Sequence, residues 1–304
     1  MIDILVSGLS FLLLALLAGN NLSVSSGAII SGRIVGRTAG ILITVIGYIA
    51  GLLAQGSLLG YGFSSIMPLD SATLVSIALT VSIAMFAIGY RLRAPLSFSI
   101  IFTTSLIGIS LAVSHAISSG FVTYIIAFWV LAPFASVIIA MLLMAHLTRQ
   151  VSKLPVWSTL RVMKLLLIAA SFLAAFTLGA NTMGILFVAV RQYTSIWILV
   201  AAIVIGGFMM SAGPLKRIGN EILPIRYMNA VVVQSVSVAL VELATAFSIP
   251  FSNTQAFTAG LYGTGAAYGT KLLPAKPLII ILLTWIFTAI MGLTLGYLLA
   301  AIVV

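Results

Sequence analysis

Donor side chains that could bind an anion are concentrated in one stretch of an otherwise apolar chain. The stretch "IPFSNTQAFTAGLYGTG" begins at Ile249 and contains Pro250. Proline removes a backbone N–H and disfavours helix at the preceding residue, so a helix broken here would restart just after Pro250. The new helix would direct free N–H groups and a positive dipole end at the break, which binds anions without a charged side chain. Hydroxyl and amide donors stand at that end: Ser252, Asn253, Thr254 and Gln255.

A weaker copy of this stretch, "APLSFSIIFTTSLIGIS", begins at Ala94. Aligned without gaps, the two stretches share six identical residues, among them Pro95 with Pro250 and Ser97 with Ser252. Taken singly, hydroxyls in membrane helices commonly bond to their own backbone or hold helices together. Because the Pro-Ser pattern occurs twice, we predict that both copies contribute to one site. The hydroxyl donors of the first copy are Ser97, Ser99, Thr103 and Thr104.

A second repeated motif places asparagine beside glycine or alanine inside apolar runs. It reads "LAGNNLS" from Leu17 and "LGANTMG" from Leu178. An asparagine here interrupts the helix and offers both carbonyl and amide groups to a substrate or a cation. The alternative is a capped helix break that binds nothing. On the first interpretation the site also includes Asn21, Ser23, Asn181 and Thr182.

Glu242, in "VELATAFSIP", is the one acidic residue inside a confidently apolar segment. A carboxylate at membrane depth is costly, so a functional role is the default hypothesis. Glu242 could carry a proton, bind a cation or pair with a basic residue, and it could instead be a neutral acid that holds helices together. We predict that it binds a proton or another cation.

Composition excludes several other kinds of protein. The chain has 304 residues, of which 62% are hydrophobic and 6% charged, and its mean hydropathy is +1.30. These values, with apolar runs near 20 residues, are typical of a polytopic membrane protein. There is no cysteine, and the two histidines lie far apart, so no metal site or other cofactor is expected. The net charge of +10 accompanies no basic, aromatic-interleaved soluble region, so nucleic acid is not an expected partner.

The apolar pattern predicts an all-α protein with about ten membrane segments and broken helices. If all ten segments cross, one set of loops carries 13 of the 14 basic residues. The positive-inside rule then places these loops in the cytoplasm of a plasma-membrane protein, with both termini outside. Arg91 and Arg93 are expected at the cytoplasmic mouth, as anion attractors or as ordinary positive-inside residues. The segments are 4–31, 39–60, 72–90, 95–113, 122–147, 165–190, 195–213, 226–248, 250–268 and 277–303.

Each half of the chain contains five of these segments, an odd number. The second half therefore enters the membrane from the opposite side, which predicts two inverted-topology repeats, 1–150 and 151–304. Segments 95–113 and 250–268 should run in opposite directions. The pair within 226–268 could be two full crossings or a hairpin that stops midway, because both of its ends are basic in either case.

These motifs resemble the inorganic phosphate transporter family of sodium- or proton-coupled permeases. That family carries a Gly-Ala-Asn-Asp motif twice, and "GANT" at Gly179 matches three of its four residues, whereas "GNNL" at Gly19 matches two. "SIPFSNTQAFTAGLYGTG" resembles the family's Pro-Ser-Thr stretch, with Gln255 at a histidine position, and "VELATA" resembles its membrane glutamate segment. The resemblance covers nearly the whole chain, and it implies inorganic phosphate as substrate and a homodimer.

This sequence departs from the family at its acidic positions. Leu22 and Thr182 replace the motif aspartates, and the first-half glutamate falls at Gly47. In the family those acids serve cation coupling and substrate binding, so proton coupling through Glu242, or passive exchange, gains weight against sodium coupling. A site of N–H, hydroxyl and amide donors also suits sulfate, which has no proton to donate to a carboxylate.

The sequence therefore predicts a secondary transporter of a tetrahedral oxyanion that works by alternating access. Phosphate is expected from the family resemblance, and sulfate is the alternative. A passive anion channel is the rival of another class, because channels also contain broken helices and inverted repeats. An intramembrane enzyme is disfavoured, because the sequence lacks paired membrane aspartates, a histidine-rich metal motif and a neighbouring Ser-His pair.

Overall fold

The computed structural model describes residues 2–67, 71–92, 96–151, 153, 155–210, 227–267 and 275–304. In these ranges the regular structure is helical, without strands. Seven helical spans there are long and apolar enough to cross a membrane. They comprise α1 (Ile2–Ser31), α2 (Arg37–Gln55) continued by η1 (Gly56–Leu59) and α3 (Gly60–Phe63), α4 (Ala72–Leu92), α6 (Ser119–Val151), α7 (Val156–Leu178) continued by η2 (Gly179–Met183) and α8 (Gly184–Val190), α11 (Tyr227–Ala246) and α13 (Ala275–Val303).

Three of the ten predicted segments form shorter helices. These are α5 (Phe98–Ala112), α9 (Ile196–Met210) and α12 (Asn253–Ala267), each 15 residues long. At about 1.5 Å per residue such a helix spans about 22 Å. A bilayer core is about 30 Å thick. The structure therefore differs from ten full-length crossings, and two of the short helices are the second arms of helical hairpins.

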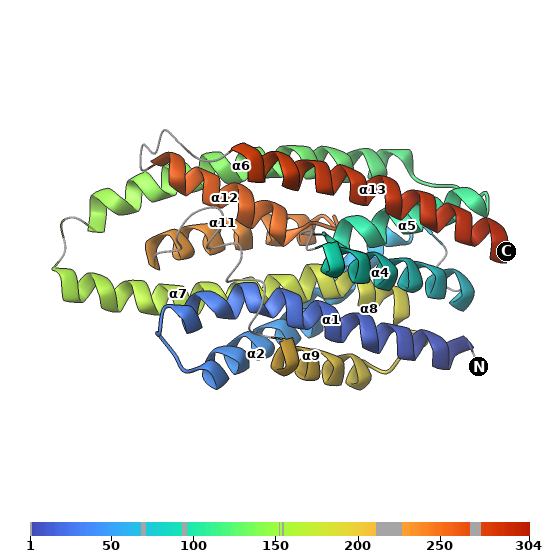
Figure 1. The fold of residues 1–304 in the computed structure, drawn as a ribbon, viewed down its shortest axis with the longest axis horizontal. Helices are drawn as coiled ribbons and strands as arrows, with labels where there is room; N and C mark the ends of the chain where they lie inside the picture. The colour runs from blue at the N-terminus through green and yellow to red at the C-terminus, as the bar shows by residue number, and fades with distance from the viewer. Residues whose placement is uncertain are drawn as a thin grey trace.

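The first hairpin consists of α4 and α5, and we call it hairpin 1 (residues 72–112). Ser110, near the end of α5, donates a hydrogen bond of 2.7 Å to the carbonyl of Ile66, which precedes α4. At the other end of the pair, Phe86 and Phe98 have ring centroids 6.4 Å apart. The two helices therefore run antiparallel, and the end of α4 and the start of α5 lie near the middle of the molecule (Figure 1).

The second hairpin consists of α11 and α12, and we call it hairpin 2 (residues 227–267). Ser237 of α11 donates to the side chain of Asn253 at the start of α12, and Val233 packs on Phe257 one turn further along. α11 ends in a Schellman motif, with Ser248 in the left-handed region at φ 58°. Hairpin 2 enters from the end of the molecule opposite to hairpin 1, so the two tips meet in the middle (Figure 1).

Each hairpin packs against a long helix that is not its neighbour in the chain. α5 packs so closely on α13 that a Cβ added to Gly108 would lie 2.1 Å from the carbonyl oxygen of Leu293. α12 packs on α6 in the same manner, and Ser136 donates to the carbonyl of Ala256 at 2.6 Å. Small residues at such crossings allow the backbones to approach closely, which is the usual way membrane helices associate.

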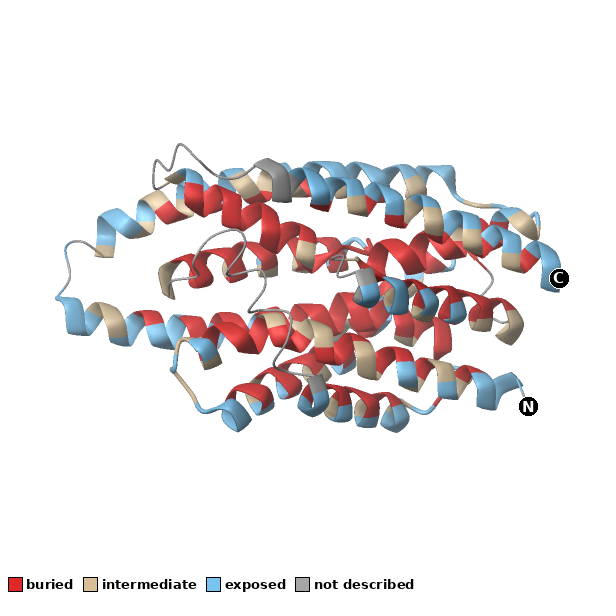
Figure 2. Cartoon of the chain, viewed as in Figure 1, coloured by how far each residue is buried: buried red, intermediate tan, exposed pale blue. Residues whose placement is uncertain are grey.

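The remaining helices form a second layer, in which α1 packs on α9 and α2 packs on α7. Figure 2 shows burial concentrated at the centre, with exposed residues along the outer helices. The exposed residues of α6 and α13 are largely apolar, for example Leu131, Phe134, Leu283 and Ile290. Apolar side chains facing outward along long helices are suited to lipid, and the chain is a multi-pass membrane protein.

Both termini lie at one end of the molecule, and the α1–α2 and α6–α7 connections lie at the other (Figure 1). We call the latter the basic end, because these connections and their flanks carry Arg33, Arg37, Arg149, Lys153, Arg161 and Lys164. Arg91 departs from this pattern. It lies in the last turn of α4, at the tip of hairpin 1 near the middle of the molecule, and not in a loop at the basic end. Arg93 and Pro95 lie outside the described residues.

Candidate functional site

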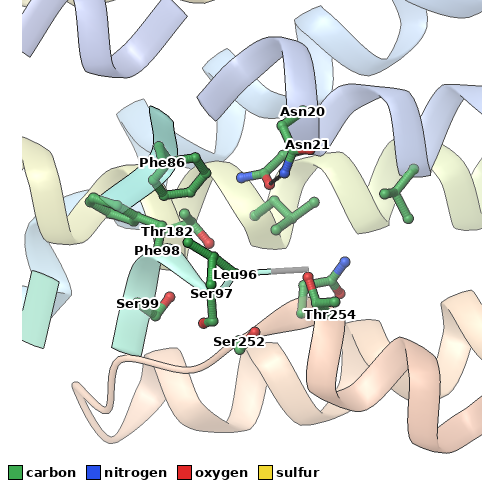
Figure 3. A pocket seen from close by; sticks show the side chains of 13 residues that line it. Asn20, Asn21, Phe86, Leu96, Ser97, Phe98, Ser99, Thr182, Ser252 and Thr254 are labelled. Atoms are coloured by element: carbon green, nitrogen blue, oxygen red, sulfur yellow. Dashed lines mark hydrogen bonds between the residues drawn. The ribbon is translucent and has the colours of Figure 1, made fainter. Parts of the chain in front are cut away.

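A small polar pocket lies where the two hairpin tips meet. Its cavity volume is about 30 Å³, so the site is nearly closed. Figure 3 shows side chains from α1, η2 and both hairpins around one gap. Among the described residues that line it, none is charged. The lining consists of Asn20, Asn21, Val24, Phe86, Leu96, Ser97, Phe98, Ser99, Leu178, Thr182, Ser252, Asn253 and Thr254.

Two helix N-termini meet at this pocket. α5 begins at Phe98 and α12 begins at Asn253, and both residues line the cavity. The tips touch directly, because Ser99 donates to the carbonyl of Phe251 at 3.1 Å. The first N–H groups of a helix have no intrahelical partner and stand at its positive dipole end. Both N-termini, together with the hydroxyl and amide side chains, make the pocket suited to an anion.

Seven of the twelve residues singled out from the sequence line this pocket: Asn21, Ser97, Ser99, Thr182, Ser252, Asn253 and Thr254. Asn20 lines it too, although the sequence interpretation chose only its neighbour. Its amide donates to the side chain of Asn21 at 3.5 Å, and Asn21 donates to the hydroxyl of Tyr48 at 3.1 Å. The adjacent pair of amides in "GNNL" was the available signal for Asn20.

Asn181 does not line the pocket but holds the tip of hairpin 2. It lies in η2, a π-helical turn that interrupts the α7–α8 helix, and such turns are frequent at functional sites. Its Nδ2 donates to Thr245 and to the carbonyl of Ile249, both at 3.0 Å. Its Oδ1 accepts from the N–H of Phe251 at 2.9 Å. Because both amide hydrogens are used, Asn181 has none left to donate to an anion in this conformation.

Four other predicted site residues also lie outside the lining. Thr104 donates back to the carbonyl of Ile100 in its own helix at 2.8 Å. Ser23 donates back to the carbonyl of Asn20 in its own helix at 2.6 Å. Thr103 and Gln255 are buried, and the Thr103 hydroxyl and the Gln255 side-chain oxygen have no hydrogen-bond partner. Neither side chain lines the cavity, and each has an unused acceptor.

The apolar part of the lining was not predicted from the sequence. Phe86, Leu96 and Phe98 form one wall, and the Phe98 ring also packs on Phe102 at 5.3 Å between centroids. Nothing in their local pattern separates these residues from the many other apolar residues of the chain. They line the pocket because hairpin 1 folds back on itself at that point.

Glu242 lies on α11 and does not line the pocket. Its Oε1 accepts a hydrogen bond of 2.6 Å from Gln55, the last residue of α2. Its Oε2 is buried and has no partner, and the side-chain oxygen of Gln55 is in the same condition. Glu242 is therefore held by the neutral amide of Gln55. Two acceptor atoms at this contact are unused, its own Oε2 and the side-chain oxygen of Gln55, and Glu242 has no basic partner among the described residues.

The first-half position that the resemblance matched to Glu242 does not lie in a hairpin. The resemblance put it at Gly47, but Gly47 lies in α2 and packs against the backbone of Phe172 in α7. Glu242 stands eight residues before Pro250, and eight residues before Pro95 is Ala87 of α4. α4 and α11 are the first arms of the two hairpins, so hairpin 1 has no acid at the same spacing from its proline.

No group of three metal-ligating side chains occurs in the described ranges. The donors gathered at the pocket are hydroxyls, amides and backbone N–H groups. Their chemistry fits reversible anion binding, and none of the lining residues is a nucleophile paired with a base.

Comparison with known proteins agrees with this arrangement. A protein of Methanocaldococcus jannaschii named as a candidate phosphate permease is 25% identical over 290 residues, covering 95% of this chain and 94% of that one. A solved structure described as the sodium-dependent phosphate transporter has the same fold, with a TM-score of 0.80 and 14% identity over 99% of this chain and 98% of that one. The pattern of the phosphate transporter family matches residues 17–296. The chain therefore belongs to the phosphate transporter family, whose members are transporters and not enzymes.

Proposed function

We propose that this protein is a secondary transporter that moves a tetrahedral inorganic oxyanion across the plasma membrane by alternating access. The observation that carries the proposal is the donor pocket, uncharged in its described lining, between two hairpin tips that enter from opposite ends. If either hairpin withdraws, the pocket gains access to one face only. The bound anion would contact Asn20, Asn21, Ser97, Ser99, Thr182, Ser252, Asn253 and Thr254, and Asn181, Ser23, Thr103 and Gln255 would support them.

Phosphate is the proposed substrate, because the chain belongs to the phosphate transporter family. Sulfate is a second candidate, and one observation favours it. Among the described residues the lining contains no carboxylate, and Thr182 occupies the place of a family aspartate within it. Phosphate keeps a proton near neutral pH and can donate it to a carboxylate, whereas sulfate needs donors alone. A lining of donors therefore serves sulfate at least as well.

Glu242 is the proposed coupling residue, and the coupling ion is H⁺ or Na⁺. An ionised carboxylate removed from water is costly unless a positive charge or several hydrogen bonds compensate it. Glu242 has one hydrogen bond from Gln55 and a buried, unpaired Oε2. A bound proton or sodium ion would supply the missing positive charge. The description of the structural relative as sodium-dependent is compatible with the second choice.

The proposed topology follows the charge asymmetry and the opposed hairpins. Residues 1–150 and 151–304 would be two inverted repeats, with the basic end in the cytoplasm and both termini outside. A homodimer is proposed from the family resemblance.

The test is uptake of labelled phosphate and sulfate into liposomes that contain the purified protein, with imposed proton or sodium gradients. Accumulation against the anion gradient, driven by one of the cations, is the expected result. Downhill flux without accumulation would favour the passive channel, and uptake of neither anion would overturn the proposal.

A further inference from the structure

A buried polar seam leads from the pocket toward the basic end between α1 and α11. The two helices run antiparallel along it. Asn21 and Ser25 of α1 and Gly32, the residue after its end, are spaced by four and seven, so they follow one face, and Asn21 lines the pocket. On α11 the matching face carries Tyr227 and Gln234, which are two turns apart.

Hydrogen bonds lie along this seam at three levels: the one nearest the pocket is within hairpin 2, and the other two join α11 to the α1 side. Nearest the pocket, Ser237 donates to Asn253, which lines the cavity. One turn further toward the basic end, Gln234 reaches the carbonyl of Ser25 at 3.5 Å. At the basic end, the hydroxyl of Tyr227 donates to the carbonyl of Gly32 at 2.6 Å.

A third helix completes the middle level. Ser171 of α7 donates to the side-chain oxygen of Gln234 at 3.0 Å, so Gln234 bridges α1 and α7. Ser25, Ser171, Gln234 and Ser237 are each at most 1% exposed. The seam is therefore closed to solvent in this conformation, although most of its side chains are polar.

Ordinary packing of membrane helices explains this seam poorly. Polar side chains that hold helices together use their hydrogen-bonding groups to do so. The hydroxyl of Ser25 is buried without any partner, and the bond from Gln234 to Ser25 is at the outer limit for a hydrogen bond. A seam with an unused hydroxyl and a long central bond is poorly sealed, and water or an anion could satisfy both groups once it entered.

We propose that this seam is the closed pathway between the anion pocket and the basic end. It opens when α11 moves away from α1, which breaks the Gln234–Ser25 and Tyr227–Gly32 hydrogen bonds that hold it closed. Ser25, Ser171 and Gln234 then line the route that the anion takes to the basic end. This inference rests on the proposed transport function, to which it adds a route and its gate.

The natural chain has no cysteine, so single cysteines report accessibility directly. Ser25→Cys is the probe, because its hydroxyl makes no hydrogen bond that the change would remove. Ser26→Cys is the matched control, since Ser26 is equally buried but bonds to the carbonyl of Leu22 in its own helix at 2.6 Å. The reagent is a small anionic methanethiosulfonate, applied to either face of liposomes that hold the purified variant.

During anion exchange, Ser25→Cys is expected to react from the basic-end face, to be protected when transport is stopped, and to lose uptake once labelled. Ser26→Cys is expected to stay unreacted. If unlabelled Ser25→Cys transports an anion but never reacts from that face, or reacts no faster than Ser26→Cys, the pathway is overturned. If it reacts but no anion is transported, the seam admits solvent and the proposed function is overturned instead.

Gln234→Leu provides a second measurement. Leucine has nearly the same size but no polar atoms, so we expect uptake to be lost while anion binding to the detergent-solubilised protein is kept. Unchanged uptake would contradict a route past residue 234. The melting temperature shows whether the variant is folded. If Gln234→Leu unfolds, the labelling experiment on Ser25→Cys decides the question alone.

Discussion

Asn181→Ala tests whether a residue outside the pocket sets the geometry inside it. The wild-type side chain makes three hydrogen bonds with the end of α11 and the tip of hairpin 2. Without it, the N–H of Phe251 loses its acceptor and the carbonyl of Ile249 loses its donor, and both residues are buried. Thr245 loses less, since its hydroxyl still donates to the carbonyl of Val241 at 2.8 Å.

The magnitude follows from those two stranded backbone groups. A buried polar group left without its partner costs about 1–3 kcal/mol, so the pair costs about 2–6 kcal/mol. At about 1.4 kcal/mol for each factor of ten, even the lower figure disfavours the assembled tip by about thirtyfold. Because the tip supplies donors to the pocket, phosphate and sulfate affinities should fall together and by a similar factor.

The assay is calorimetric titration of both anions into the purified protein, with the melting temperature measured alongside. Asn21→Ala is the matched control, because that side chain lines the pocket but donates only to Tyr48. It strands one buried group, the Tyr48 hydroxyl, so it should weaken binding with a smaller fall in melting temperature than Asn181→Ala, which strands two backbone groups and should lower both quantities further. An unchanged melting temperature in Asn181→Ala, or a loss confined to one anion, would refute the positioning role and favour direct contact.

Three further variants test other parts of the molecule. Gly51→Ala places a Cβ 1.8 Å from the carbonyl oxygen of Phe176 and should cost about 1–3 kcal/mol of stability by thermal melting, whereas Gly8→Ala, with open space around it, should cost little. Glu242→Gln should abolish cation-driven accumulation in liposomes but spare anion exchange, and unchanged accumulation would remove Glu242 from coupling. Thr182→Asp adds a carboxylate to the pocket and should shift competition binding from sulfate toward phosphate; an unaltered ratio would contradict the argument about donors.

The sequence predicted the parts of the site that depend on local chemistry. Proline followed by hydroxyl and amide residues indicated two helix starts, and the structure places Ser99 of one against Phe251 beside the other. Hydropathy correctly indicated helices throughout the described ranges. The repeated Pro-Ser pattern correctly indicated that residues about 150 positions apart come together, because both copies begin a helix at the same pocket.

The rest depends on tertiary contacts that local patterns do not contain. Hydropathy does not distinguish a crossing from an arm that turns back midway, so α5 was expected to be a full span, and the pair that became α11 and α12 was left open between two crossings and a hairpin that stops midway. The face on which Glu242 lies is set by the rotation of α11 against α2, through Gln55. Asn181 was assigned as a ligand because an asparagine amide can bind either an anion or a cation. In the structure, however, its amide hydrogens are donated to Thr245 and Ile249 of hairpin 2.

The packing of α5 on α13 has a consequence for biosynthesis. Hairpin 1 leaves the ribosome early, but the helix that supports it, α13, is the last to be made. Hairpin 2 is in the opposite situation, because α6 precedes it in the chain. The polar tip of hairpin 1 must therefore wait in the translocon or bilayer, without its support, until synthesis ends. Nascent chains that stop before residue 275 should carry an assembled hairpin 2 and an undocked hairpin 1, a difference that cysteine labelling of stalled chains would detect.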